Sequence, residues 1–201
     1  MITQHLILAL LWTVYCALHS LLAASWFKKK MQIRMGKNYK HYRLFYTLFA
    51  FISLIAIIYY QIRIETIKLF LPTTVSYVLG GLVTITGLVI MMICIGKYFV
   101  SLSGIKSLVQ EHSGSSQLII TGIHRYVRHP LYLGTFIFIW GLLILFPQLS
   151  LLMANTIITG YTLAALKWEE AKLIAEFGDD YRSYKQNVPA ILPRLSRNRK
   201  L

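Results

Sequence analysis

The sequence predicts an all-α integral membrane protein, with a single membrane domain of five transmembrane helices across residues 1–201. Hydrophobic residues make up 56% of the chain and charged residues only 14%, which is too apolar for a soluble domain of this length. The charged residues are bunched between apolar blocks, each near the roughly 20 residues that cross a hydrocarbon core. Because backbone groups in lipid must be hydrogen-bonded internally, the blocks are expected to be helices. They cover residues 3–27, 44–62, 76–95, 131–146 and 149–166.

The first three blocks each fit a membrane helix. The block at 3–27 has no basic segment before it, and its apolar stretch is too long for a cleaved signal peptide. The block at 44–62 directly follows a basic segment. The third block places Gly80, Thr84 and Gly87 on one helix face. Small residues on one face predict that another helix approaches closely there.

The last two blocks are short, and only Pro147 and Gln148 separate them. They are therefore expected to form a tight antiparallel hairpin. From Lys167 the fifth helix is predicted to continue beyond the membrane and to end at Gly178, a residue type common just after a helix C-terminus. The segment DDYRSYKQNVPAILP that follows is predicted to fold back under the membrane surface, so that residues 167–201 form a cytoplasmic C-terminal segment.

The distribution of basic residues predicts how the chain crosses the membrane. Seven lysines and arginines lie in residues 28–43, four in 96–130 and eight after residue 166, whereas only Arg63 and Lys68 lie elsewhere. With five spans, the three rich segments fall on one side, and the positive-inside rule makes that side cytoplasmic. The N-terminus is therefore expected outside and the C-terminus inside.

The formal net charge of +14 does not predict a nucleic-acid partner. The anionic headgroups of membrane lipids are sufficient partners for basic segments placed in this way. Cys16 and Cys94 lie inside predicted spans without paired spacing, so neither a disulfide framework nor a metal site is expected.

The segment TGIHRYVRHPLYLG is the strongest candidate for a binding site. Pro130 suits the first position of the fourth helix, whose unpaired N–H groups and partial positive charge would face the cytoplasmic interface. Arg125, Arg128 and His129 add to a receptor suited to a carboxylate or a phosphate. Gly134, one turn further, would let a flat ring approach the backbone. The alternative is that the arginines only anchor the helix at the headgroups.

Glu170 is the second candidate. On a helical projection it falls near the centre of an apolar stripe, whereas Glu169 falls on the opposite, solvated shoulder. An ionisable group on such a face is a functional candidate by default. The alternative is an ion pair with Arg128 that holds the C-terminal segment in place, and both roles are compatible. The same stripe leads back into the membrane through three polar residues, Thr162, Thr159 and Asn155.

Two sets of motifs carry a resemblance to known proteins. The C-terminal set comprises Gly122 through Gly134, Glu169-Glu170, Phe177-Gly178, Tyr181, Tyr184 and Val188-Pro189. It resembles the signature of the superfamily of isoprenylcysteine carboxyl methyltransferases and phospholipid methyltransferases. The second set comprises LHSLLA at 18–23, HYRLFY at 41–46 and residues 100–108. It resembles a bacterial branch that holds methanethiol S-methyltransferases and membrane proteins associated with nitric-oxide reduction.

This resemblance implies an integral enzyme of a bacterial inner membrane that uses S-adenosylmethionine in a non-Rossmann pocket on the cytoplasmic side. It implies catalytic roles for Glu170 and Arg128. The prenylcysteine branch places an arginine shortly before its glutamates, where this chain has Ala165 and Leu166, which argues against a prenyl-carboxylate substrate. The residues expected to bind the cofactor are Arg125, Arg128, His129, Pro130, Tyr132, Gly134 and Tyr181.

The expected methyl acceptor is a small thiol or a lipophilic molecule. A carboxylate acceptor is already ionised and would be repelled by Glu170. A thiol with a pKa near 8.5, or an amine, would gain from a nearby base.

His19 in the first block supports a second interpretation. It is either one partner of an interhelical hydrogen bond or a ligand of haem, because the same bacterial branch also resembles zeta-carotene isomerase, a haem-dependent membrane enzyme. The alternative function is therefore a haem-binding membrane protein of the nitric-oxide-reduction-associated or zeta-carotene isomerase type.

Overall fold

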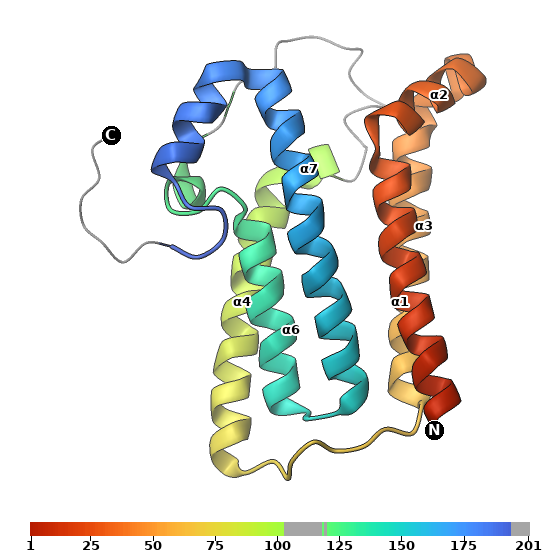
Figure 1. Ribbon diagram of the computed structural model, residues 1–201, viewed down its shortest axis with the longest axis vertical. Coiled ribbons are helices and arrows are strands. Elements are labelled where there is room, and N and C mark those ends of the chain that lie inside the picture. The colour runs from red at the N-terminus through yellow and green to blue at the C-terminus, as the bar shows by residue number, and fades with distance from the viewer. Residues whose placement is uncertain (103–117, 119, 194–201) are drawn as a thin grey trace. The chain divides into compact units, whose positions relative to one another are not determined.

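A computed structural model describes residues 1–102, 118 and 120–193 of the protein. Their regular structure is helical, apart from one isolated antiparallel bridge between Lys68 and Gln148. The helices, shown in Figure 1, are α1 (Ile2–Ala23), α2 (Ser25–Met35), the 3-10 helix η1 (Gly36–His41), α3 (Tyr42–Arg63), α4 (Thr74–Leu102), the 3-10 helix η2 (Gly122–Arg125), α6 (Pro130–Leu145) and α7 (Leu149–Asn187).

Four helical stretches in the described part of the chain are long and apolar enough to cross a membrane, which confirms the integral membrane character. They are Ile2–Ala23, Ser25–Arg63, Thr74–Gly96 and Leu149–Asn187. The fourth predicted span, 131–146, corresponds to α6, which has 16 residues. At about 1.5 Å per residue it is roughly 24 Å long, shorter than a hydrocarbon core of about 30 Å.

The first helix ends earlier than its apolar block. The backbone of Ala24 is extended (φ −64°, ψ 138°), so α1 stops at Ala23 and α2 begins at Ser25. The expected span of 3–27 is therefore too long at its C-terminal end. Trp26, which extended the block in the sequence, lies in α2 and is 63% exposed.

The described residues form two compact units, each with its own packing. The described residues of the first unit are Met1–Pro72, 96–102 and Phe146–Tyr161, and there α1 and α3 pack side by side (Figure 1). Inside this pair the indole of Trp12 donates a hydrogen bond of 2.8 Å to Gln61. The buried core of the first unit consists of Leu8, Trp12, Ile57, Ile64 and Ala154.

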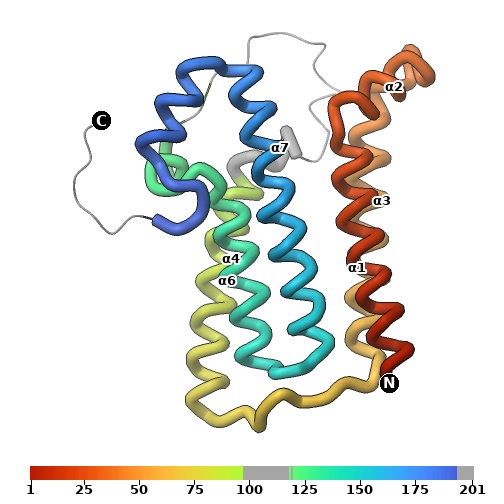
Figure 2. Tube along the Cα trace, viewed as in Figure 1, coloured from red at the N-terminus to blue at the C-terminus, as the bar shows by residue number. Residues whose placement is uncertain are grey.

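The described residues of the second unit are Thr73–Ile95, 118, 120–145 and 162–193. Figure 2 shows α4 and α6 lying side by side within it. A Cβ added to Gly87 would lie 2.7 Å from Phe138 Cα, and one added to Gly141 would lie 2.6 Å from the backbone nitrogen of Thr84. The small-residue seam predicted on the third block is thus confirmed as the contact with α6.

The end of α7 also follows the prediction in part. Gly178 has φ +59°, which breaks the helix where the sequence predicts a stop. The chain then turns sharply and resumes a helical course up to Asn187 (Figure 2). An L side chain rarely adopts this φ, so glycine is favoured at the turn.

Substitution of Gly87 by alanine tests the helix seam. We expect Gly87→Ala to lower the unfolding temperature, because the new methyl group meets backbone atoms of α6 that have no rotamer to change. Overpacking of this kind costs roughly 1–3 kcal/mol, and each kcal/mol corresponds to about 2–4 °C in a chain of this size. Thermal unfolding in detergent would measure the change.

Gly81→Ala is the matched control, since nothing lies within 4 Å of its added Cβ. Alanine favours helix over glycine by about 1 kcal/mol, so this variant should unfold at the same temperature or higher. Equal effects of the two substitutions would contradict a contact at Gly87.

Candidate functional site

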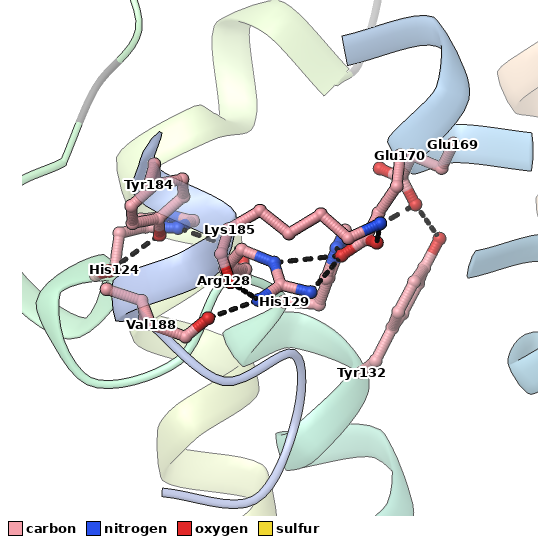
Figure 3. A network of polar contacts seen from close by, with 9 residues as sticks. All are labelled: His124, Arg128, His129, Tyr132, Glu169, Glu170, Tyr184, Lys185 and Val188. Atoms are coloured by element: carbon pink, nitrogen blue, oxygen red, sulfur yellow. Dashed lines mark hydrogen bonds and ion pairs between the residues drawn. The ribbon is translucent and has the colours of Figure 1, made fainter. Parts of the chain in front are cut away.

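The segment at the start of α6 meets the C-terminal half of α7 within the second unit. Pro130 is the first residue of α6, as predicted, and it is buried. The residues before it, from Gly122 to His129, form η2 and a short connection. Figure 3 shows the polar network that links this connection to α7 and to the chain after Gly178.

Arg128 and Glu170 form a buried ion pair at the centre of the network. Their side chains are only 7% and 8% exposed. Arg128 Nε donates to Glu170 Oε1 at 2.8 Å, and its Nη2 donates to the same oxygen. The ion pair that the sequence offered as one interpretation of Glu170 is therefore present.

Lys185 completes the environment of the Glu170 carboxylate. Its Nζ lies 2.7 Å from Glu170 Oε2, so both carboxylate oxygens face cations. Burial raises the pKa of Glu170, but the hydrogen bonds and charges of Lys185 and Arg128 outweigh that effect and hold the pKa below its usual value. Glu170 is consequently a carboxylate held in its ionised form.

The chain after α7 closes over the start of α6, and we call its residues 188–190 the C-terminal strap. Arg128 Nη1 donates to the carbonyls of Lys185, at 3.0 Å, and of Val188. The backbone N–H groups of Arg128 and His129 donate to the carbonyls of Pro189 and Ala190, each at 2.9 Å. The predicted fold-back of this segment therefore ends at the candidate site.

His129, Tyr132 and Glu169 form the second half of the network. The rings of His129 and Tyr132 are stacked, with centroids 5.4 Å apart, and the Tyr132 hydroxyl donates to Glu169 Oε2. His129 Nε2 lies 3.4 Å from Glu170 Oε1, and its Nδ1 lies 3.8 Å from Glu169 Oε2. Burial lowers the pKa of His129 against the opposing influence of the two glutamates, so the neutral ring is favoured.

Tyr181 is buried beside this network, with 1% of its surface exposed. Within the described residues its hydroxyl makes no hydrogen bond of good geometry, and it interacts with the Arg128 side chain. Burial, followed by the negative charge of Glu170, raises the pKa of Tyr181 to about 12, while nearby Arg128 opposes the shift. The hydroxyl therefore stays protonated and can donate to a bound molecule.

Two predicted cofactor residues, Arg125 and Gly134, make no side-chain contact with this polar network among the described residues. The side chain of Arg125 is exposed at the end of η2, and no ion pair or hydrogen bond of this side chain occurs among the described residues. A Cβ on Gly134 would lie 3.0 Å from both Ile90 and Met91 of α4. Because α4 fills the space beside Gly134, this packing gives no support to its expected role as a platform for a flat ring.

Other site residues were not foreseen in the sequence. Glu169 looked like an ordinary solvated residue, yet its side chain is only 44% exposed and accepts a hydrogen bond from Tyr132. Lys185 follows the turn at Gly178, so its position on a helical projection could not predict its contact with Glu170. The polar stripe leading to Glu170 does face protein, since Asn155 and Thr162 are both buried.

His19 lies in the first unit and has no part in this network. Its ring faces the Tyr46 hydroxyl, at 3.0 Å from Nδ1 and 3.2 Å from Nε2. This is the interhelical hydrogen bond between α1 and α3 that the sequence suggested. A role as haem ligand stays a prediction.

Comparison with known proteins gives a consistent result. A family model described as phospholipid methyltransferase matches residues 75–180, a range that includes α4 from Val75, α6 and Glu169-Glu170 and ends before Tyr181. Among curated proteins, the protein-S-isoprenylcysteine O-methyltransferase of Schizosaccharomyces pombe is 31% identical over 111 residues, which are 51% of this chain and 47% of that protein.

Methanethiol S-methyltransferases match over shorter ranges. Methanethiol S-methyltransferase 2 of Bradyrhizobium diazoefficiens is 40% identical over 79 residues, 39% of this chain and 29% of that protein. The enzyme of the same name from Crocosphaera subtropica is 35% identical over 74 residues, 37% of this chain and 28% of that protein. The matches thus span about half or less of each relative. No solved structure matches the chain.

Removal of Arg128 should destabilise the protein strongly. Arg128→Ala leaves Glu170 buried with only Lys185 as a cation and releases the strap carbonyls. Loss of one partner of a buried pair typically costs roughly 3–5 kcal/mol. Arg125→Ala removes an exposed arginine of the same segment and should cost less than about 0.5 kcal/mol. Thermal unfolding of both variants decides this, and similar unfolding temperatures would contradict the buried ion pair.

Stability should fall at acidic pH in two steps. The pKa values of His129 and Glu170 are lower in the folded chain than their ordinary values of 6.5 and 4.5. The unfolded chain therefore binds more protons below these values, and stability is lost as the pH falls. Unfolding temperatures measured between pH 8 and pH 4 should decline below about pH 6.5 and again below about pH 4.5. His129→Gln should remove the first decline and Glu170→Gln the second.

Proposed function

Because this chain belongs to the phospholipid methyltransferase family, we propose that it is a membrane enzyme that transfers a methyl group from S-adenosylmethionine to a small thiol or a lipophilic acceptor. One observation carries this proposal. The Arg128-His129-Pro130 sequence at the start of α6 packs directly against Glu169-Glu170 of α7, and the family model covers both segments.

The residues around this network suit a zwitterionic cofactor. Tyr181 offers a buried hydroxyl beside Arg128 that can donate to a ligand. Glu169 offers a carboxylate that is 44% exposed and can attract the ammonium group of an amino acid. His129 and Tyr132 supply a stacked pair of rings beside that carboxylate. We propose that these four residues bind S-adenosylmethionine, with Pro130 fixing the start of α6.

Arg128 then acts by position rather than by direct contact. Four hydrogen bonds of its side chain go to Glu170, Lys185 and Val188, so its guanidinium is already occupied. We propose that Arg128 holds Glu170 and the C-terminal strap in place. Arg125, which is exposed, remains the arginine that could reach the carboxylate of the cofactor.

Glu170 is better suited to act through its charge than as a proton acceptor. A carboxylate with a lowered pKa is a weak base, whereas a thiol ionises near pH 8.5. Its negative charge would instead stabilise the positive charge that develops on a neutral thiol or amine as this acceptor takes up the methyl group. Bound S-adenosylmethionine supplies an electrophilic methyl group on a sulfonium, and the side chains of the site contribute by aligning the reactants and excluding water.

The acceptor remains within the two classes named above. One relative is named for transfer to the oxygen of an isoprenylcysteine protein and the others for transfer to the sulfur of methanethiol. A carboxylate acceptor would approach two glutamates, which favours the thiol. The excess of lysines and arginines on three segments supports a site on the cytoplasmic side of the membrane, with the N-terminus outside.

Substitution of each glutamate separates binding from turnover. We expect Glu169→Gln to weaken S-adenosylmethionine binding about tenfold, because a favourable charge interaction of roughly 1.4 kcal/mol is lost. Glu170→Gln should keep the affinity within about threefold and lose most of the turnover. Calorimetric titration of the purified protein and transfer of a labelled methyl group to thiols, amines and prenylated acceptors would measure both quantities.

Glu176→Gln, an exposed glutamate of the same helix, is the control and should change neither quantity. No measurable binding of S-adenosylmethionine by the unaltered protein would refute the proposal. Binding unaffected by His129→Ala would place the cofactor elsewhere, and full turnover of Glu170→Gln would remove that residue from the mechanism.

A further inference from the structure

The helix α2 has two different faces within the first unit. Phe27, Met31 and Met35 follow one another at intervals of four residues and therefore share one face, and all three are half-buried. The ring of Phe27 lies 6.5 Å from the ring of Tyr42, the first residue of α3. This face of α2 is therefore the one that packs against the rest of the unit.

The opposite face of α2 carries Trp26, Lys29, Lys30 and Ile33, which are spaced to lie together on a helix and are all exposed. We call these four residues the outer face of α2. Trp26 is 63% exposed and Ile33 is 79% exposed, so two large apolar side chains flank two lysines. Lysines beside exposed aromatic and aliphatic side chains are typical of helices that lie in the membrane interface.

The lysines of the outer face have no anionic partner in the described part of the protein. Neither Lys29 nor Lys30 forms an ion pair there. The sequence contains no aspartate or glutamate before Glu65, whereas residues 28–43 contain seven lysines and arginines. A surface of this charge is complementary to lipid headgroups that carry a net negative charge.

Both ends of this segment tie it to the membrane boundary. Only Ala24 separates α2 from α1, and η1 leads from α2 directly into α3. Both α1 and α3 belong to stretches that are long and apolar enough to cross a membrane. The extended backbone of Ala24 turns α2 away from α1 (Figure 1). With 11 residues, α2 is roughly 16 Å long and can lie along the membrane surface but cannot leave it.

We propose that the outer face of α2 binds the anionic phospholipids of the bilayer that the protein spans. Trp26 and Ile33 enter the boundary between headgroups and acyl chains, and the ammonium groups of Lys29 and Lys30 reach the headgroups beside them. The two apolar side chains distinguish this face from a basic segment that contributes only charge. The outer face shares no residue with the proposed cofactor site and does not depend on methyl transfer.

Quenching of Trp26 fluorescence by brominated lipids tests this surface. The full chain is reconstituted in vesicles of phosphatidylcholine and phosphatidylglycerol, with bromine on the acyl chains of one lipid or the other. The signal of Trp26 is the difference between the unaltered protein and Trp26→Phe. We expect both lipids to quench it, with a preference for phosphatidylglycerol of at least about fivefold, the ratio that one lysine beside an anionic surface supplies.

Removal of the lysines tests the contribution of charge. The double variant with Lys29→Gln and Lys30→Gln should lower the preference for phosphatidylglycerol to less than about twofold. The matched control, with Arg63→Gln and Lys68→Gln, removes two exposed cations that lie outside the basic segments and should leave the preference unchanged. Equal quenching by the two lipids in the unaltered protein, or a preference that survives the loss of both lysines, would overturn the binding of anionic lipid.

Removal of Ile33 tests the apolar contact. Ile33→Gln should reduce the quenching of Trp26 at least about twofold, because the outer face loses one of its two apolar side chains. Gln32→Asn changes an exposed neighbour on another side of α2 and should have no effect. A Trp26 that neither brominated lipid quenches would overturn the proposal, because the outer face would then lie in water or against a protein partner.

Discussion

The buried ion pair between Arg128 and Glu170 is the interaction on which the rest of the second unit depends. Two charges that are 7% and 8% exposed are tolerated only when their hydrogen-bonding groups are satisfied. The planar guanidinium does this in several directions at once. It bonds Glu170 on one side and the carbonyls of Lys185 and Val188 on the other. One side chain therefore joins the start of α6, the middle of α7 and the C-terminal strap.

This arrangement gives the adjacent carboxylates of Glu169 and Glu170 different roles. Glu170 is enclosed by cations and fixed in its ionised form, whereas Glu169 stays half-exposed with one hydrogen bond from Tyr132. Neighbouring residues on a helix point about 100° apart, so one glutamate can serve the interior while the next serves a ligand. We infer that the pair combines a structural charge with an accessible one, and that the accessible charge meets the cofactor.

The sequence predicts those features that leave a pattern in residue type. Helix periodicity placed Glu170 on a protein-facing stripe, the spacing of Gly80, Thr84 and Gly87 marked the contact with α6, and Pro130 and Gly178 marked a helix start and a helix break. Other features leave no such pattern. The strap is held through backbone carbonyls, which every residue has. Lys185 reaches Glu170 only because the turn at Gly178 redirects the chain. The helix break at Ala24 lies inside an apolar run, and no residue type in that run predicts it.

The strap is held at Pro189 and Ala190 by their peptide oxygens rather than by their side chains. An acceptor of this kind is the same for any amino acid, so natural sequence drift at these two positions would leave the closure intact. Arg128 cannot be replaced in the same way, because its guanidinium group bonds several partners at once. Among homologues, we expect the arginine at the position of Arg128 to be nearly invariant. We expect the amino acids of the strap to vary, whereas the number of residues between the glycine turn and the strap should stay constant.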